Sequence, residues 1–309
     1  MEKLVVIITG PTCSGKSDIA YRLAQMMDTE IISADSRQMY RELNIGTAKP
    51  PKEYLNTVKH HFIDSHSLTE SFDAGEFEQE SINIISRLHG ENKIPIACGG
   101  SGLYIRSLKT GIIDIPPNEE VRESLDQKRQ AIGNEGIYAL LQTVDPESAE
   151  KMIPQNYKRV MRALEVFYIT NKTIGEIQKN HKRDFNPVFL MFGINWEREI
   201  LYDRVNKRVD KMMEEGLLKE VQSITASENY RGLNALNTVG YKEIIAHLNG
   251  ETTLETAISH IKRNTRHFAK RQLTWFRDEP DIKWLPAANE STISNFCEII
   301  HAEIVNYRS

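Results

Sequence analysis

The sequence predicts an α/β protein in which helices flank a parallel sheet and an all-helical insertion interrupts the chain. Short apolar runs rich in β-branched residues have the pattern of buried strands; they lie at residues 3–9, 31–33, 94–98 and 187–194. Apolar residues at helical spacing lie between the first three of them, at 16–27 and 77–88. This order is typical of a parallel sheet with crossover helices. Residues 118–183 show helical periodicity and no convincing strand, which predicts the insertion.

The remaining elements complete a two-part organisation. Residues 61–63 are a possible further strand, and residues 282–285 form a late one. The rest of the C-terminal half is mostly amphipathic helix, at 197–250 and 253–276. We therefore expect a core domain with a helical C-terminal part and a helical insertion domain. Their expected bounds are 1–115 with 186–309 for the core, and 116–185 for the insertion.

The composition is that of a protein that needs neither a membrane nor disulfide bonds. Of the 309 residues, 40% are hydrophobic and 27% are charged, which is ordinary for a globular protein. No run approaches the roughly 18–20 apolar residues of a membrane span, and the apolar N-terminal run is too short for a secretory signal. The three cysteines lie far apart without a C-x-x-C pair, so neither a disulfide framework nor a zinc site is indicated. We expect a cytoplasmic protein that requires no protein partner.

A phosphate-binding motif follows the first predicted strand. Every fixed position of G-x-x-x-x-G-K-[ST] is matched by Gly10-Pro11-Thr12-Cys13-Ser14-Gly15-Lys16-Ser17. The glycines allow backbone N–H groups to turn toward phosphate oxygens, and the following helix directs its positive N-terminus at them. Lys16 adds a full positive charge, and the Ser17 hydroxyl can ligate Mg²⁺. The motif predicts a P-loop NTPase-like sheet that grips a diphosphate or polyphosphate; it indicates ATP binding by pattern alone and names no reaction.

Two further loops are expected at the same edge of the sheet as the P-loop, because residues just beyond the C-terminal ends of parallel strands face the ligand crevice. These loops are Asp35-Ser36-Arg37-Gln38 and Gly99-Gly100-Ser101. Phosphoryl transfer would require a carboxylate on the magnesium side, for which Asp35 and Asp64 are the candidates. Asp35 is equally suited to capping a turn.

Sequence blocks spread over nearly the whole chain point to one family. They are Gly10–Ser17, Asp35–Tyr40, Asn44–Pro50, Gly99–Tyr104, Arg159–Val166, Gly240–Glu243 and Ala269–Phe276. In these residues and their order the chain resembles the bacterial tRNA dimethylallyltransferases of the IPP transferase family. The resemblance implies transfer of a dimethylallyl group from dimethylallyl diphosphate to N6 of the adenosine on the 3′ side of the anticodon in tRNA, with release of diphosphate.

The resemblance also implies roles for individual residues. Asp35 matches the family's general base, and Ser101 stands where the family usually has a threonine beside the leaving group. Lys16 and Arg208 face the diphosphate, which the P-loop from Gly10 to Ser17 holds together with Mg²⁺ on Ser17. The implied contacts with the tRNA anticodon stem-loop are Asp35, Ser36, Arg37, Gln38, Ser101, Lys158, Arg159, Arg162, Lys242, Lys262, Arg266, Lys270 and Arg271.

A basic segment near the C-terminus supports binding of RNA. The whole chain has a formal net charge of −4, which alone argues against a nucleic-acid partner. Residues 262–277 nevertheless hold seven basic side chains and no acidic one, and several of these recur every fourth residue on one helix face. We expect this face to contact phosphates and Trp275 and Phe276 to belong to the core. The target base is expected to flip out of its stack to reach the crevice.

Three other functions fit parts of the sequence. The P-loop alone also suits a kinase that phosphorylates a small molecule or a nucleotide with ATP. Prenyl transfer to a free adenine nucleotide is a second possibility, although it needs neither the basic helix nor the insertion. A third is a regulatory RNA-binding module that uses its P-loop as a switch, and such a module would need no catalytic carboxylate.

Overall fold

The computed structural model describes residues 3–112, 115–180, 183–230 and 232–308. Its backbone contacts divide the chain into two compact units. The larger unit consists of Met1–Thr110 and Phe185–Ser309, and the smaller of Gly111–Asp184. The sequence analysis places the insertion at 116–185.

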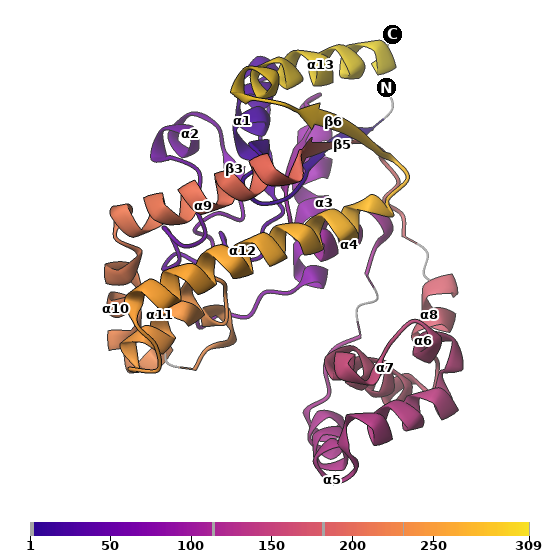
Figure 1. Ribbon diagram of the computed structural model, residues 1–309. Helices are drawn as coiled ribbons and strands as arrows, with labels where there is room; N and C mark the ends of the chain where they lie inside the picture. Colours follow the sequence, from indigo (N-terminus) through magenta and orange to yellow (C-terminus); the bar gives the residue numbers. More distant parts are fainter. Residues whose placement is uncertain (1–2, 113–114, 181–182, 231, 309) are drawn as a thin grey trace. The chain divides into compact units, whose positions relative to one another are not determined.

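The larger unit contains a six-stranded parallel sheet with the strand order β3-β2-β4-β1-β5-β6 (Figure 1). The strands are β1 (Leu4–Thr9), β2 (Ile31–Ser33), β3 (His60–His61), β4 (Ile96–Gly99), β5 (Val188–Trp196) and β6 (Ile282–Ala287). The predicted P-loop NTPase-like α/β fold is confirmed. The chain leaves the sheet after β4 and returns as β5 directly beside β1, so the smaller unit is inserted between two strands of one sheet.

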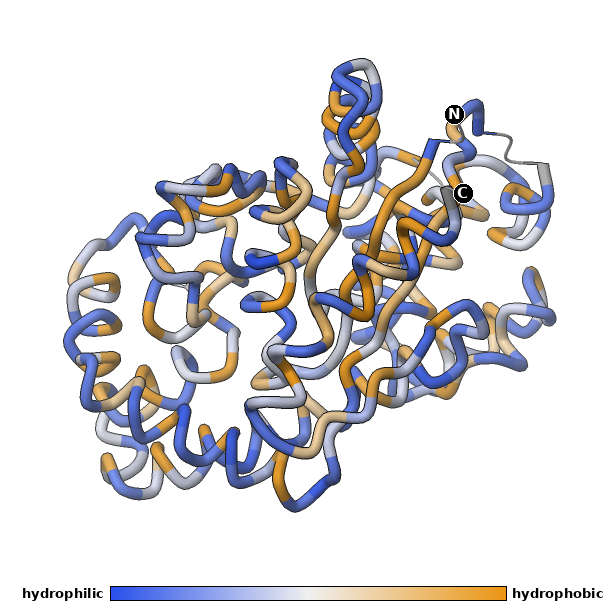
Figure 2. Tube along the Cα trace, turned by 90° about the horizontal axis from the view of Figure 1, so that it is seen from above, coloured by the Kyte–Doolittle hydropathy of each residue, from blue (hydrophilic) through white to orange (hydrophobic). Residues whose placement is uncertain are grey.

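Helices cover both faces of this sheet. The crossover through α1 (Lys16–Met26) runs from β1 toward the β3 edge, and the crossover through α3 (Ala74–Gly90) runs back from β3 to β4. Because both crossovers are expected to be right-handed, the two helices lie on opposite faces. On the α1 face, Val6 and Ile8 belong to a buried cluster with residues of α1 and of α13 (Glu290–Arg308). Figure 2 shows hydrophobic residues along the extended segments at the centre of the molecule.

The predicted helices of the C-terminal half form a second core. They are α9 (Arg198–Glu215), α10 (Leu217–Ala226), α11 (Tyr241–Leu248) and α12 (Leu254–Arg277), with short 3₁₀ turns at Glu228–Tyr230 and Asn234–Leu236. Their buried residues, among them Val209, Tyr241 and Ile261, cluster with Met39 and Leu43 from the segment after β2. This cluster holds the helices against the segment that follows the second strand. Two further helices of this unit are α2 (Lys52–Thr57) and α4 (Gly102–Thr110).

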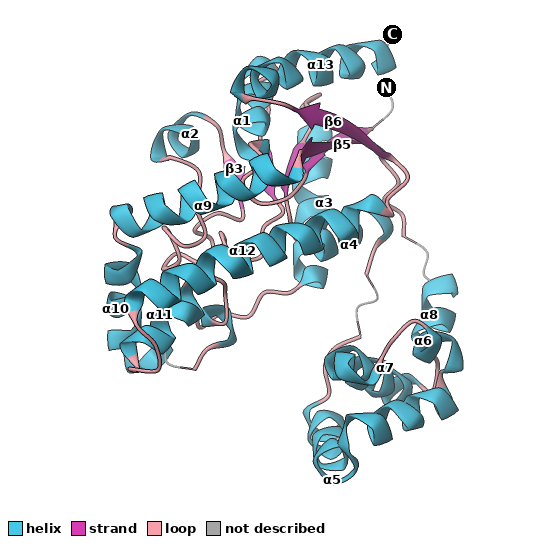
Figure 3. Ribbon diagram, in the orientation of Figure 1, coloured by secondary structure: helices cyan, strands magenta, loops and turns pink. Residues whose placement is uncertain are grey.

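In the part of the smaller unit that the structure describes, the regular elements are all helices, joined by short loops (Figure 3). Its helices are α5 (Glu119–Val144), α6 (Pro146–Glu150), α7 (Tyr157–Thr170) and α8 (Ile174–Asn180), with a 3₁₀ turn at Pro154–Asn156. Gly133 breaks the helical backbone inside α5, with φ 73° and ψ −179°. Ile137 and Leu141 of α5 pack against Val160 and Leu164 of α7 in a core of this unit's own.

One sequence prediction requires correction, and one helix was missed. The strand expected at 61–63 is instead the two-residue β3 (His60–His61), because Phe62 has a φ of 62°, in the left-handed region that ends extended pairing. Helix α13 was not predicted at all, although its Ile293, Phe296 and Ile300 are buried in the main core.

Among the described residues, no helix combines the length and the apolar character needed to cross a membrane.

Gly99, the last residue of β4, is the point at which the sheet leaves least room for a side chain. A Cβ built on Gly99 would lie 2.0 Å from the carbonyl oxygen of Ala34, the residue after β2. That oxygen also accepts a hydrogen bond from Ser101 N at 3.1 Å, so it has little freedom to move. Gly99→Ala is therefore expected to lower the free energy of unfolding by more than about 2 kcal/mol, measured by urea denaturation.

Gly90→Ala is the matched control. No heavy atom lies within 4 Å of a Cβ built on Gly90, the last residue of α3. Its effect is expected to stay within about 1 kcal/mol and to be neutral or stabilising. Equal destabilisation by the two substitutions would contradict the close approach of β2 and β4.

Candidate active site

Three loops meet at the C-terminal edge of the sheet because of the register of its strands. Thr9 of β1 is paired with Gly99 of β4, and Ser33 of β2 is paired with Cys98 of β4. The residues that follow each strand therefore emerge side by side. They are the P-loop after β1, the loop of Asp35 after β2 and the loop of Ser101 after β4, as the sequence predicted.

The P-loop backbone curls at the N-terminus of α1. Three of its residues have positive φ: Gly10 at 145°, Cys13 at 64° and Gly15 at 89°. A Cβ on Gly10 would lie 2.9 Å from the carbonyl oxygen of Ile194 in β5, so glycine is required here by space as well as by conformation. The buried Ser14 Oγ has no hydrogen-bond partner among the described residues, which leaves this hydroxyl able to donate to a phosphate oxygen.

Residues distant in sequence fasten the P-loop from outside, and the sequence analysis did not identify them. The indole of Trp196 donates to the Ser14 carbonyl at 2.9 Å. Arg204 Nε donates to the Cys13 carbonyl at 2.8 Å, and its guanidinium lies 4.2 Å from the centre of the Trp196 ring. Gln272 of α12 accepts a hydrogen bond from Thr12 N at 2.8 Å. These contacts fix two of the loop's carbonyls and one of its amides.

Lys16 lies among the charged groups that the sequence assigned to the diphosphate site. Its Nζ donates to the Pro11 carbonyl at 3.2 Å. Burial lowers the pKa of Lys16 from its usual range, while the Asp35 carboxylate raises it and the Arg208 guanidinium lowers it. Arg208 comes from α9 and also donates to the Ala48 carbonyl at 3.4 Å. The structure thus brings Lys16, Asp35 and Arg208 together from three parts of the chain.

Asp35 and Ser101 are linked through the backbone of Ser36. Asp35 Oδ1 accepts hydrogen bonds from Arg37 N at 2.9 Å and from Gln38 N at 3.4 Å, so the carboxylate does cap a turn. A carboxylate has about four acceptor positions, and capping leaves most of them free. Ser101 Oγ accepts from Ser36 N at 3.0 Å. The turn that begins at Asp35 therefore links the carboxylate predicted to act on the acceptor with the hydroxyl predicted to act on the donor.

The other sequence candidate for a magnesium-side carboxylate, Asp64, is engaged elsewhere. Its Oδ1 forms an ion pair with Lys49, whose Nζ also donates to the Tyr40 carbonyl at 2.7 Å. Asp64 thus stabilises the segment after β2.

Ser17 is the residue whose chemistry suits Mg²⁺. Mg²⁺ is usually held by one or two protein oxygens together with substrate phosphates and water, and Ser17 offers a half-buried hydroxyl oxygen at the start of α1. This hydroxyl contacts Cys98, whose pKa is raised to about 12 by burial, with Lys16 and Ser17 acting in the opposite sense. The thiol is therefore neutral and does not compete as a ligand. Among the described residues there is no cluster of three or more His, Cys, Asp or Glu side chains able to hold a metal.

The basic residues of α12 divide into two groups. Lys262 pairs with Asp210 at 2.5 Å, and Arg266 donates to Asn206 Oδ1 at 2.7 Å, so both lie against α9. Lys270 and Arg271 are exposed. Elsewhere in the same unit, Gln38 donates to the carbonyls of Thr47 and Ala48, and Lys242 lies 4.0 Å from Glu243. Contact of these residues with RNA stays a prediction, and Lys270 and Arg271 are the most available for it.

Trp275 was predicted to lie in the core, and this is wrong. Phe276 is fully buried, whereas Trp275 is 43% exposed. Successive helical residues point about 100° apart, and the inward face of α12 is already filled by Phe276 together with Gln272. The indole instead lies over Gly102, where a Cβ would meet its Cδ1 at 2.3 Å.

The three basic residues predicted in the insertion differ in their surroundings. Arg162 donates to the buried Glu165 at 2.7 Å and to the Ile115 carbonyl at 2.6 Å. The carboxylate of Glu165 also binds Arg122 at 2.8 Å. Lys158 and Arg159 are exposed and have no ion-pair partner among the described residues. Arg162 thus has a structural role in its own unit, while Lys158 and Arg159 remain available.

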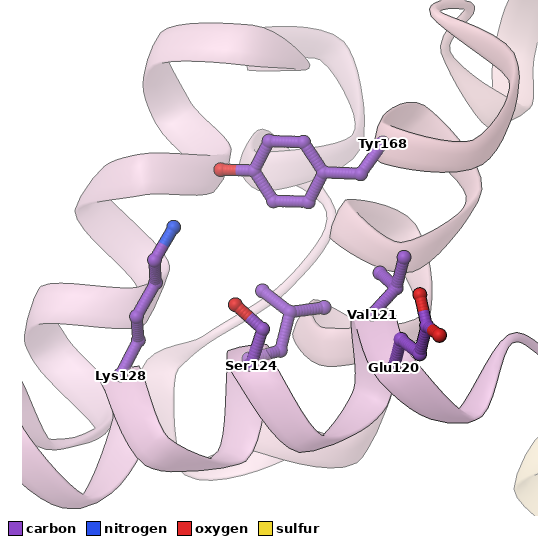
Figure 4. Close-up of a pocket in the computed structure, with 6 residues that line it drawn as sticks. Glu120, Val121, Ser124, Lys128 and Tyr168 are labelled. Carbon is purple, nitrogen blue, oxygen red and sulfur yellow. The ribbon is translucent and has the colours of Figure 1, made fainter.

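A hollow of about 260 Å³ lies between α5 and α7 of the insertion (Figure 4). It is lined by Glu120, Val121, Ser124, Leu125, Lys128 and Tyr168. Lys128 Nζ lies 5.4 Å from the centre of the Tyr168 ring. The hollow contains none of the residues that the sequence assigned to chemistry.

Known proteins similar to this chain share its whole length. A tRNA dimethylallyltransferase of Christiangramia forsetii is 40% identical over 305 residues, which cover 98% of this chain and 99% of that protein. A second, tRNA dimethylallyltransferase 1 of Bacteroides thetaiotaomicron, is 41% identical over 300 residues, covering 97% and 96%.

Solved structures and a family model agree with these relatives. The full-length tRNA isopentenylpyrophosphate transferase of Bacillus halodurans superposes with a TM-score of 0.71 at 35% identity, covering 99% of this chain and 98% of that one. A eukaryotic dimethylallyltransferase acting on tRNA gives a TM-score of 0.84 at 28% identity, covering 99% and 80%. The model of the IPP transferase family matches residues 38–279. This chain belongs to the IPP transferase family.

Proposed function

We propose that this chain transfers a dimethylallyl group from dimethylallyl diphosphate to N6 of the adenosine on the 3′ side of the anticodon in tRNA. The observation that supports this most directly is the convergence of Asp35, Ser101 and the P-loop at one edge of the sheet. A P-loop binds phosphate, and a carboxylate and a hydroxyl beside it provide what an amine acceptor and a diphosphate leaving group require. The named relatives support the same reaction.

On the donor side, the bond between the prenyl carbon and the diphosphate oxygen breaks, and negative charge accumulates on the departing diphosphate. Lys16, Arg208 and the loop amides are fixed donors aimed at that charge, and such donors stabilise a transition state most where water is excluded. Ser17 would hold Mg²⁺, which when bound adds positive charge beside the phosphates. Ser101 would donate a hydrogen bond to the leaving oxygen.

On the acceptor side, the exocyclic amine of adenine is a poor nucleophile because its lone pair is delocalised into the ring. As the C–N bond forms, N6 must lose a proton, and Asp35 would accept it. The Asp35 carboxylate interacts electrostatically with Lys16 of the P-loop, so the proposed base lies beside the proposed diphosphate site. The reaction is balanced by the prenylated adenosine, the diphosphate and one proton.

We infer that the acceptor is tRNA from the names of the relatives and from two exposed cations on α12. Lys270 and Arg271 project from the same helix that supplies Gln272 to the P-loop. The adenine must leave its stack to reach Asp35. We place the reaction in the cytoplasm, in keeping with the three free cysteines.

Asp35→Asn tests the proposed base. An amide keeps the size of the side chain and the oxygen that accepts from Arg37 N, but it cannot take up a proton. Transfer measured under single-turnover conditions is expected to fall by about 10²–10⁴-fold, while the dissociation constant of an anticodon stem-loop changes little.

Asp28→Asn is the matched control, because the Asp28 carboxylate is 95% exposed beyond the end of α1. It should transfer as the unchanged protein does. Full transfer activity in Asp35→Asn would remove the general base from the mechanism.

A second prediction concerns the contribution of the exposed cations of α12 to binding of RNA. Replacing Lys270 and Arg271 together by Ala should weaken binding of the stem-loop and reduce the slope of log K against log salt concentration by about 1–2. Lys283→Ala, which removes a cation paired with Glu303, should leave the slope unchanged. An unchanged slope in the double variant would show that α12 does not contact phosphates.

A further inference from the structure

Gln272 is a buried polar side chain that bridges two loops of the site. It is 6% exposed, and its Oε1 accepts from Thr12 N at 2.8 Å while its Nε2 donates to the Gly100 carbonyl at 2.9 Å. Thr12 belongs to the P-loop, and Gly100 immediately precedes Ser101. One amide of α12 therefore joins the loop that grips the diphosphate to the loop that carries the leaving-group hydroxyl.

Gly100 is shaped by this contact. A Cβ on Gly100 would lie 2.2 Å from Gln272 Nε2, whereas the φ of Gly100 lies outside the left-handed region. Glycine is thus needed at this position for the approach of the glutamine and not for the backbone conformation. Gly100 therefore leaves the space that the side chain of Gln272 occupies.

We propose that Gln272 is a positioning residue that sets the spacing of the P-loop and the Ser101 loop, and thereby the affinity of the site for diphosphate. The inference rests on the proposed function for the identity of that ligand. Because Thr12 N–H is bonded to Gln272, it is not a phosphate donor, and the backbone donors lie closer to α1. Gln272 is the neighbour of Arg271, so the helix that is proposed to bind RNA also contacts the P-loop.

The two hydrogen bonds need a group that donates at one end and accepts at the other. Glutamine does this at every pH. An ionised glutamate has two acceptor oxygens and would set one of them against the Gly100 carbonyl. A protonated glutamate again has one donor and one acceptor, and burial raises the pKa of a carboxyl group. The protonated form of Gln272→Glu is therefore expected to make both hydrogen bonds, and the ionised form to lose the one to the Gly100 carbonyl.

The experiment measures the dissociation constant of inorganic diphosphate with Mg²⁺ by calorimetry, at pH 8.5 and pH 6. Relative to the unchanged protein, Gln272→Glu is expected to bind about ten-fold more weakly at pH 8.5, the effect of losing one or two net hydrogen bonds. At pH 6 the deficit should shrink to about two-fold. The charged groups around the site, Lys16, Asp35 and the diphosphate, are the same for both proteins, so their contribution cancels in the ratio.

Gln272→Met is the second variant, since it keeps the length of the side chain and can make neither hydrogen bond. It should bind diphosphate weakly at both pH values. Gln222→Glu, at an exposed position of α10, should match the unchanged protein throughout. Circular dichroism at both pH values reports whether each variant is folded.

A pH-independent deficit in Gln272→Glu, or full affinity in Gln272→Met, would overturn the positioning role. In turnover, the variants should raise KM for the prenyl diphosphate and leave KM for the stem-loop unchanged; a general loss of stability would not separate the two. If the unchanged protein binds diphosphate but does not prenylate RNA, the proposed function fails while the role of Gln272 can still be judged from binding.

Discussion

The parallel pairing of β4 with both β1 and β2 is the constraint on which the site depends. It brings the ends of three strands level, so that the P-loop, Asp35 and Ser101 leave the sheet at one edge. Gly99 and Ala34 approach so closely at this point that a single methyl group would disturb the edge. The sheet therefore positions the P-loop and the side chains proposed as base and leaving-group donor, and residues of α9 and α12 hold the P-loop in place.

The sequence could predict what depends on neighbouring residues. Continuous apolar runs marked the buried strands, and the P-loop pattern predicted its own loop and the helix that follows it. The order of the strands was not predicted, and the meeting of the three loops was expected only because parallel strands end at one edge of a sheet. His60–His61 is too short to have a pattern, and α13 has only a modest amphipathic signal.

The supports of the P-loop could not be predicted, because their partners are far away along the chain. Trp196 and Arg204 act across 182 and 191 residues, and Gln272 across 260. No local pattern distinguishes these side chains from ordinary polar residues of a strand end or a helix. Trp275 was wrongly expected in the core. It is adjacent to the buried Phe276 on α12, and the spacing of apolar residues along this helix did not show which of the two neighbouring aromatic residues faces inward.

The central claim is that the P-loop holds a prenyl diphosphate whose diphosphate leaves, and that nothing is phosphorylated. The most direct test is mass spectrometry of nucleosides from tRNA incubated with the protein, dimethylallyl diphosphate and Mg²⁺, with AMP as a competing acceptor and ATP consumption followed in parallel. The expected result is dimethylallyl-adenosine in tRNA, a strong preference for tRNA over AMP, and no use of ATP. Prenylated AMP with unmodified tRNA, or phosphoryl transfer from ATP, would contradict it.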